Sequence, residues 1–415
     1  ETLPMGACAR CLSAGARSTE STQRRLTATL RVMLSRFDDY PIHQTPDPVA
    51  HPATSDKDVY ERYWFNGYST SGDFYLGAGA ALYQHLGVKD AHVSFIHEGR
   101  QYAFHVSGRR SDEPSDLTIG PYSLEIIEPM RSCRITVTEN DTDFTCDLLW
   151  EGRTGNVEEP RHHLGRGLRK IMDTTRFTQL GRWTGWVQFG DVRIELDPSE
   201  VVGTKDRSWG VRPLIGGDTR GAPAASQMGG IFFLWAPLNF DDLCLHYQLF
   251  DDNVGRPLFQ VGARLPVYGS PDELPGVEDP AVEHMRNLEH EVTFASGNRM
   301  ITGATIAMTS VADGARHEVR LEPIFTFRMK GIGYTHPIWV HGKWHDELAM
   351  ASESWALDDV DDTAYENQHC QHLVRATYTD GAGVERTGIG VLEQNILGPY
   401  APYGLEGFFA APTYD

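Results

Sequence analysis

Short stretches of apolar and aromatic residues, separated by polar, glycine or proline turns, run through this chain from residue 58 to residue 394. Many short strands at such spacing are typical of an all-β sandwich or barrel. The 41 glycines of the chain suit many tight turns. We therefore predict an all-β fold with a few short helices. Strands are expected at 60–68, 73–78, 91–97, 101–107, 122–129, 133–139, 143–150, 182–189, 192–196, 230–238, 243–251, 256–267, 290–294, 300–309, 317–328, 336–341, 372–379 and 385–394.

The same pattern divides the chain into a tail and two β-rich halves. Residues 1–57 are predicted to hold an N-terminal tail, an amphipathic helix at 21–37 and a linker. We favour a helix that docks on a β-domain over one that lies on a membrane or acts as a lid. Residues 58–200 and 201–415 are predicted to form the first and second β-domains. Short helices are expected within 161–175 and 280–288.

Charge and composition exclude several classes of partner. The net charge of −20 would repel nucleic acid, so we expect no nucleic-acid partner. No apolar run approaches the roughly 20 residues of a spanning helix, so we expect no transmembrane segment. No secretory leader pattern is visible, which favours the cytoplasm, with the periplasm as the alternative.

The six cysteines do not form the pattern of a disulfide scaffold. Cys133 and Cys146 flank a predicted hairpin turn and could face each other across two strands. We favour two reduced thiols over a disulfide there. Cys8 and Cys11 form a lone CxxC without a second pair, and a structural zinc site needs four ligands.

The stretch Gly203-Thr-Lys-Asp-Arg-Ser-Trp-Gly-Val-Arg-Pro213 joins the two halves and places a tryptophan among charges. Charge is costly to bury and tryptophan is costly to expose, so such a segment is expected to line a cavity or clamp a junction. We expect Asp206, Arg207 and Trp209 to act in catalysis and Arg212 to bind substrate. The alternative is a structural ion pair of Asp206 with either arginine, and Trp209 in the core.

Further acid–base candidates lie in the second half. Asn239 and Asp242 follow an apolar strand. Asn239 is a candidate substrate contact, and Asp242 is a candidate general acid at a cavity mouth or else a solvated turn residue. His246 is a candidate general base or else a core histidine, and its neighbour Tyr247 is a candidate substrate contact. Glu393 lies in an otherwise apolar strand, where it competes with Asp242 as proton donor or else pairs with an arginine.

The segment His336-Pro-Ile-Trp-Val-His341-Gly-Lys-Trp-His345 gathers three histidines and two tryptophans. His336 and His341 would face opposite sides of a regular strand, and zinc would need a third and a fourth ligand. We therefore predict no metal site. Trp339 of this segment is expected, like Trp64 and Trp235, to contact an apolar substrate.

Three stretches resemble the motifs of a known family. Glu61-Arg-Tyr-Trp-Phe-Asn-Gly67 is similar to its E-x-W-Y-x-x-G opening, and Gly185-Trp-Val-Gln-Phe-Gly190 to its G-x-V-x-x-x-G strand. Gly203 to Gly210 is similar to its G-x-x-D-H-N-W-G motif. Together they resemble the two-domain, lipocalin-like family of carotenoid 1,2-hydratases (hydroxyneurosporene synthases), AttH-like proteins and fungal decalin-forming Diels–Alderases.

This resemblance implies two lipocalin-like β-barrel domains side by side, with an apolar ligand cavity at their junction. It also implies chemistry at alkenes without a metal or redox cofactor. The chain departs from the motif because Arg207 replaces its histidine and Ser208 its asparagine, and the strand at 231–237 lacks the acid expected there. Because a guanidinium stays protonated, Arg207 is expected to hold a carboxylate, phosphate or enolate rather than to transfer a proton.

The sequence thus predicts a cofactor-independent enzyme for an isoprenoid-, terpenoid- or steroid-like substrate. The expected reactions are hydration or dehydration, isomerisation or cyclisation by acid–base chemistry at an alkene. The alternative is a non-catalytic carrier or sensor of a lipophilic small molecule. Convergence of acidic and basic groups inside the cavity would favour the enzyme. A hydrophobic small molecule is the expected partner, and a homodimer is left open.

Overall fold

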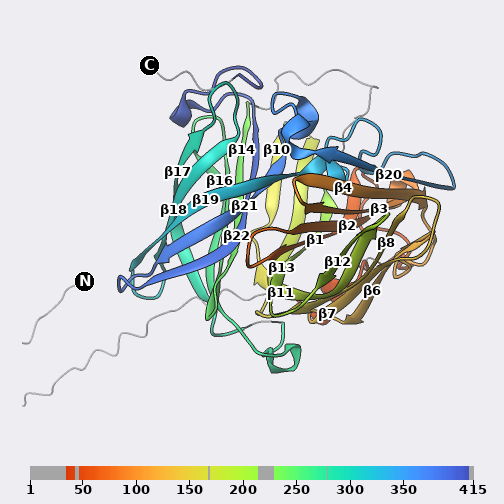
Figure 1. The fold of residues 1–415 in the computed structure, drawn as a ribbon, viewed down its shortest axis with the longest axis horizontal. Helices are drawn as coiled ribbons and strands as arrows, with labels where there is room; N and C mark the ends of the chain where they lie inside the picture. Colours follow the sequence, from red (N-terminus) through yellow and green to blue (C-terminus); the bar gives the residue numbers. More distant parts are fainter. Residues whose placement is uncertain (1–33, 43–45, 167–168, 214–228, 278, 411–415) are drawn as a thin grey trace, which may run out of the picture. The chain divides into compact units, whose positions relative to one another are not determined.

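The computed structural model describes residues 34–42, 46–166, 169–213, 229–277 and 279–410, and β-strands dominate it (Figure 1). The all-β prediction is confirmed, with two large antiparallel sheets. The described helices are short 3-10 turns: η1 (Arg36–Asp39), η2 (Gln84–Leu86), η3 (Pro271–Glu273), η4 (Met329–Ile332), η5 (Leu357–Asp359), η6 (Tyr365–Asn367) and η7 (Ala401–Tyr403). Within the described residues, no helix has the length and hydropathy needed to cross a membrane.

The first sheet has fourteen strands and wraps around an apolar core. Its main path runs β20-β4-β3-β2-β1-β13-β11-β8-β7-β6-β5, and β9, β10 and β12 pair with β11. The strands are β1 (Val59–Ser69), β2 (Tyr75–Tyr83), β3 (Val88–His97), β4 (Arg100–Arg109), β5 (Thr118–Ile119), β6 (Tyr122–Glu128), β7 (Ser132–Val137), β8 (Phe144–Gly152), β9 (Val157–Glu158), β10 (His162–Arg166), β11 (Arg169–Phe189), β12 (Val192–Leu196), β13 (Val201–Val211) and β20 (Leu348–Ala356).

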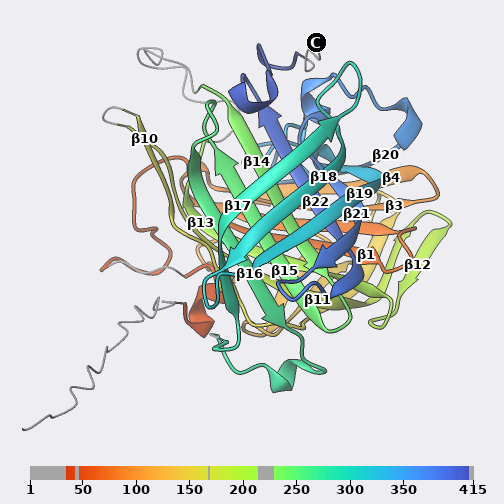
Figure 2. The ribbon, with the colours of Figure 1, turned by 90° about the vertical axis from the view of Figure 1, so that its left-hand side faces the viewer.

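The second sheet closes into a barrel, with neighbouring strands in the order β14-β15-β16-β17-β18-β19-β21-β22 (Figure 2). Closure pairs β14 with β22, so each of the eight described strands has a neighbour on both sides, although β16 and β17 pair only from Gly262 to Arg264. The strands are β14 (Ile231–Asn239), β15 (Leu243–Asp251), β16 (Pro257–Pro266), β17 (Glu283–Phe294), β18 (Ile301–Ser310), β19 (Arg316–Arg328), β21 (Cys370–Thr379) and β22 (Glu385–Leu397).

Strand β1 explains the aromatic stretch noted in the sequence, because it is buried along its whole length. Tyr63 and Phe65 point into the core of the first sheet. Trp64 and Tyr68, on the other face, pack in a separate core with Trp235 of the second barrel. Since both faces of β1 are covered, the strand needs apolar surface at nearly every position rather than at alternate ones.

The strand that we expected to open the second domain belongs to the first sheet. β13 lies between β1 and β11, in register from Val59 opposite Val211 to Ser69 opposite Val201. β20, although it follows six strands of the barrel in sequence, pairs with β4 at the edge of the first sheet. The two sheets therefore do not divide the chain at residue 200.

Two helix predictions are wrong. In the described part of 161–175, residues 162–166 form β10 and residues 169–175 begin β11. Arg161 and Lys170 both pair with Asp173, at 2.6 and 2.7 Å. Within 280–288 the chain enters β17, where a register shift between Arg286 and Glu289 produced a helix-like spacing of apolar residues. The helix predicted at 21–37 falls mainly on residues 1–33, which lie outside the described residues.

The strand predicted at 336–341 is also wrong, because this segment is a loop. The His336 ring accepts hydrogen bonds at Nδ1 from the backbone N–H groups of Ile338 (3.0 Å) and Trp339 (2.8 Å). These bonds turn the chain and take the place of ladder hydrogen bonds.

Candidate functional site

A cavity of about 390 Å³ lies between the two sheets. Strands β1, β10, β11 and β13 of the first sheet line one side, and β14, β15 and β22 of the barrel line another. The segments around η4 and η6 complete the wall. This volume is in the range of small-molecule sites. Aromatic side chains supply much of the lining: Tyr60, Trp64, Phe233, Trp235, Phe250 and Tyr334.

Strand parity decides which charged residues reach this cavity. On β13, Asp206 and Ser208 line it, whereas the intervening Arg207 does not. On β1, Tyr60 and Trp64 line it, whereas Tyr63 points into the first core. Successive side chains of a strand point to opposite faces, so each strand divides its residues between the cavity and the core.

An ion-paired group of three side chains occupies the wall built by the first sheet. Arg176 of β11 donates a hydrogen bond to Asp206 Oδ2 at 2.7 Å, and its Nε lies 3.0 Å from Glu159 Oε2. Glu159 is fully buried, and Asp206 is 8% exposed. Arg176 thus holds two carboxylates, and only Asp206 of the two lines the cavity.

The two carboxylates titrate in opposite directions. Burial raises the pKa of Asp206 to about 6 because, together with the negative charge of Glu159, it outweighs the attraction of Arg176. Burial would also raise the pKa of Glu159, but Arg176, His246 and His162 lower it to about 2. The group is therefore expected to carry one ionised carboxylate and one whose proton is exchanged near neutral pH.

A second carboxylate, Glu393, enters from the barrel. His369 Nε2 lies 2.7 Å from Glu393 Oε1, and the Gln371 amide donates to Glu393 Oε2. Gln371 Oε1 in turn accepts hydrogen bonds from Tyr75 and Asn66 of the first sheet. This network fixes the orientation of Glu393 at the cavity and links the two sheets.

Tyr334 lies at the cavity wall between two guanidinium groups. Arg212 donates to its hydroxyl at 3.4 Å, and the Arg62 guanidinium carbon lies 4.8 Å from the ring centroid. Arg62 is 2% exposed, and none of its guanidinium nitrogens has a hydrogen-bond acceptor among the described residues. Burial would raise the pKa of Tyr334, but the two arginines outweigh burial and lower it.

These groups give the cavity the means for proton transfer next to an apolar wall. A buried carboxyl with a pKa near 6 can donate a proton, and a carboxylate held by hydrogen bonds can accept one. A phenol between guanidinium groups can donate a hydrogen bond to a developing oxyanion. Among the described residues, no cluster of three metal-ligating side chains converges on the cavity. The one such cluster, His105, His336 and Glu353, lies outside its lining.

Five of the residues singled out in the sequence lie together at this cavity. They are Asp206, Arg212, Glu393, Trp64 and Trp235. They come from β1, β13 and the residue after it, β14 and β22, so the fold brings together positions more than 300 residues apart.

Arg207 and Trp209 do not line the cavity, and the position that we predicted for them is wrong. The Arg207 guanidinium is fully buried, pairs with Glu61, and lies 4.4 Å from the Tyr63 ring centroid. Trp209 packs near Arg207 and the ring of Phe177. The structural alternative is right only in placing Arg207 in a buried ion pair. Its acid is Glu61 and not Asp206, which pairs with Arg176, and Trp209 is half-buried rather than part of the core.

Asp242 and His246 also lie away from the cavity lining. Asp242 is exposed in the turn after β14 and pairs with Arg386 at 3.0 Å, so the alternative of a solvated turn residue holds. His246 is fully buried, with Nε2 3.5 Å from Glu159 Oε1. His246 therefore contacts the carboxylate that pairs with Arg176, without lining the cavity.

The remaining substrate-contact candidates have structural partners. Asn239 donates to the Tyr68 hydroxyl at 2.8 Å, and Tyr247 donates to a backbone carbonyl inside the barrel. Trp339 stacks on His105, with the ring planes 7° apart. None of the three lines the cavity.

Sequence reasoning missed Arg176, Tyr334 and the role of His369. Arg176 follows the basic stretch that we read as helical, and strand alternation around Phe177 was its only signal. Tyr334 follows the strand predicted at 317–328, and nothing local distinguishes it. His369 contacts Glu393, and nothing in the sequence pattern indicated that contact.

Comparisons with known proteins place this chain in a family. The model of a family of unknown function (DUF8625) matches residues 34–406. No curated protein matches the sequence.

Several solved structures match across most of the chain. Kievitone hydratase from Nectria haematococca is 12% identical, with 81% of this chain and 89% of that chain covered and a TM-score of 0.47. An AttH-like protein from Nitrosomonas europaea is 11% identical, with 81% and 92% covered and a TM-score of 0.45. CghA with Sch210972 is 10% identical, with 82% and 89% covered and a TM-score of 0.47. At TM-scores below 0.5 and identities of 10–12%, these matches carry no argument about the fold or the activity of this chain.

Proposed function

We propose that this chain, which belongs to the family of unknown function DUF8625, is an enzyme that acts on a hydrophobic small molecule by acid–base chemistry in the cavity between its sheets. The observation that carries the proposal is Asp206. A carboxyl group with a pKa raised to about 6, mainly by burial, lies in a cavity wall that also holds several aromatic side chains. Perturbed groups of this kind concentrate at functional sites.

Asp206 has an oxygen available for the proton. Its Oδ2 accepts from Arg176, whereas its buried Oδ1 has no hydrogen-bond partner among the described residues. We assign Asp206 as general acid, with the proton carried on Oδ1. Near neutral pH a fraction of the molecules hold this proton, because burial keeps the carboxyl protonated at a pH at which an exposed aspartate would be ionised.

The other polar groups suit the remaining roles. Arg212 and Tyr334 would hold an oxygen of the substrate, either a carboxylate or the carbonyl oxygen of a conjugated enone that becomes an enolate. Glu393, oriented by His369 and Gln371, would accept a proton or orient a water molecule. Trp64 and Trp235 would pack on the hydrocarbon part and stabilise positive charge that develops on it.

These roles define a lyase or isomerase type of reaction. Asp206 would transfer its proton to one alkene carbon, and the positive charge that results would be resolved by addition of water with loss of a proton to Glu393, by direct loss of a proton to Glu393, or by ring closure. With a conjugated enone, Glu393 would first remove a proton to give the enolate, and Asp206 would then protonate a carbon of that enolate. Such proton transfers require no redox cofactor. Isoprenoid-, terpenoid- or steroid-like molecules have the size and apolar character that the lining requires.

Deuterium incorporation tests the proposal. The protein is incubated in D₂O with any co-purified ligand identified by native mass spectrometry, and otherwise with a panel of steroid-sized conjugated enones. We expect deuterium at a carbon of the recovered molecule, and we expect Asp206→Asn to abolish the incorporation. A non-catalytic carrier would bind the molecule and return it without deuterium at carbon.

Asp242→Asn is the matched control. It makes the same change at an exposed aspartate that pairs with Arg386 outside the cavity. We expect this variant to incorporate deuterium like the wild type. Equal incorporation by Asp206→Asn and the wild type would reject Asp206 as the acid, and binding without exchange by the wild type would reject the enzyme.

A further inference from the structure

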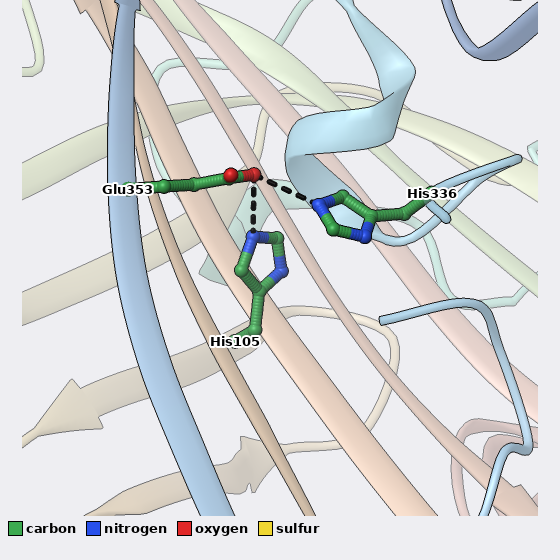
Figure 3. A group of neighbouring side chains, drawn as sticks. All are labelled: His105, His336 and Glu353. Atoms are coloured by element: carbon green, nitrogen blue, oxygen red, sulfur yellow. Dashed lines mark hydrogen bonds and ion pairs between the residues drawn. The ribbon is translucent and has the colours of Figure 1, made fainter. Parts of the chain in front are cut away.

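Three polar side chains, one of them from the loop of residues 333–345, meet outside the cavity (Figure 3). Glu353 of β20 presents Oε1 to both imidazoles, at 3.3 Å from His105 Nε2 and 2.9 Å from His336 Nε2. His105 is fully buried, His336 is 5% exposed, and Glu353 is 40% exposed at its side chain. We call these three residues the triad.

The backbone of the loop fixes the tautomer of His336. Nδ1 of this ring accepts two backbone N–H bonds, from Ile338 and Trp339. A neutral imidazole has one nitrogen that accepts and one that donates, so the proton of His336 must lie on Nε2. That N–H points at Glu353 Oε1, to which it donates.

This tautomer argues against a metal ion at the triad, although the potential ligand atoms lie within 4.8 Å of one another. Metal binding at His336 Nε2 would require a lone pair on a nitrogen that carries the proton. A metal-bound histidine normally donates from its other nitrogen, whereas Nδ1 here accepts. His105 and Glu353 alone provide fewer than the three protein ligands of a catalytic zinc site.

Polar contacts lead from the triad into the first sheet and back to the same loop, although the contact of His92 with Asp90 is too long for a hydrogen bond. His105 Nδ1 lies 2.8 Å from His92 Nδ1, and His92 Nε2 lies 3.7 Å from Asp90 Oδ1. Asp90 Oδ2 then accepts the backbone N–H of Gly342 at 2.7 Å. The loop is therefore tied to β20, β4 and β3 at two points, residues 336 and 342.

Charge supports this arrangement without a metal. Burial lowers the pKa of His105 to about 3, so its imidazole is neutral. Burial opposes the charge of Glu353, but the hydrogen bonds from His105 and His336 outweigh it and lower its pKa, so it is ionised. A carboxylate that accepts two imidazole N–H bonds is satisfied as it stands.

The loop supplies part of the cavity wall. Tyr334, Val340 and His341 all line the cavity, and Tyr334 lies two residues before His336. Gly333 and Thr335, on either side of Tyr334, have φ angles of 88° and 55°. Both are left-handed conformations, which persist in Thr335 only where surrounding contacts hold them.

We propose that Glu353 and His336 are positioning residues that hold the loop of residues 333–345 so that Tyr334 contacts Arg212 through its hydroxyl and Arg62 through its ring. The part that Tyr334 plays in the reaction rests on the proposed function, whereas the placement of its ring does not. The groups that face Tyr334 are these two arginines together with His341, His369 and, at longer range, Glu393.

Tyrosine ionisation, followed by ultraviolet absorbance, tests the proposal without a substrate. Tyr334 is the one described tyrosine for which a lowered pKa is resolved, so it should ionise first, and Tyr334→Phe should remove that first phase. In Glu353→Ala the loop loses its anchor, and we expect the first phase to move up by about one pH unit or more. His336→Ala should do the same if the first variant fails to fold.

Ser354→Ala is the matched control. It removes a 3.1 Å hydrogen bond from Arg100, also between β20 and β4, without touching the loop. We expect the first phase to stay in place in this variant. An unchanged first phase in folded Glu353→Ala and His336→Ala would overturn the proposal, as would stoichiometric binding of Zn²⁺ or Co²⁺ that His336→Ala abolishes. Failure of deuterium exchange at Asp206 would leave the placement of Tyr334 untouched.

Discussion

Replacing Asp206 by asparagine should change how the stability of the protein depends on pH. Asparagine keeps the shape of the side chain and an oxygen for the hydrogen bond from Arg176, but it cannot ionise. Burial, opposed by Arg176 and assisted by Glu159, raises the pKa of Asp206 from 3.8 to about 6. The native wild type therefore holds a proton between about pH 4 and 6 that the unfolded chain has lost.

The sign and size of the effect follow from linkage. Because the native state binds the extra proton, the free energy of unfolding of the wild type decreases as pH rises through this window and levels off above pH 6. At 1.36 kcal/mol per pKa unit, the rise from 3.8 to about 6 amounts to about 3 kcal/mol. The wild type should lose about 2 kcal/mol of this free energy of unfolding between pH 4.5 and pH 8.

Urea unfolding of the wild type and Asp206→Asn at pH 4.5 and pH 8 measures the effect. The free energy of unfolding of the variant minus that of the wild type should be about 2 kcal/mol more positive at pH 8 than at pH 4.5. Effects of the substitution that do not depend on pH cancel in this comparison. For Asp242→Asn we expect a relative change below about 0.5 kcal/mol. A difference between the wild type and Asp206→Asn that stays constant with pH would refute the assignment of Asp206 as a buried acid.

Three further outcomes are expected. Arg207→Ala should lower the free energy of unfolding by about 3–5 kcal/mol in urea denaturation, because it removes the partner of buried Glu61; a loss below about 1 kcal/mol would contradict this. Gly203→Ala should lower the melting temperature far more than Gly303→Ala. A Cβ at Gly203 would lie 2.0 Å from the Asn66 carbonyl oxygen, whereas at Gly303 it would lie 3.2 Å from one hydroxyl, and equal losses would refute this. Finally, DTNB should not label the four described thiols before the protein unfolds, because burial raises their pKa: Cys133, Cys146, Cys244 and Cys370. Rapid labelling of a folded variant that retains only these four cysteines would contradict this expectation.

Local pattern was sufficient for most strands of the fold. The predicted strands at 192–196 and 243–251 coincide with β12 and β15, because alternation and turn residues act within a few residues. The same reasoning failed where pairing was irregular or absent. In β17 a bulge near Asn287 changed the spacing of the apolar residues, and at His336 side-chain-to-backbone bonds replaced a strand.

The sequence indicated a site residue only where that residue differed in polarity or charge from its neighbours. Glu393 stands out as an acid in an apolar strand, and Asp206 and Arg212 as charges beside a tryptophan. Arg176 and Tyr334 carry no such local sign. Arg176 matters because it meets carboxylates on two other segments, and Tyr334 because it lies between two arginines far away in the chain.

Alternating apolar runs and frequent turns were enough to make this an all-β chain, since they depend on near neighbours alone. These local patterns could not show which face of β13 lines the cavity. Asp206 and Arg207 are adjacent in the chain, yet one lines the cavity and the other pairs with Glu61 in the core. That choice depends on how β13 aligns with β1 and β11, and a shift of one residue would exchange the two side chains. Pairing between segments so far apart in the sequence is settled only when both faces of the sheet are covered.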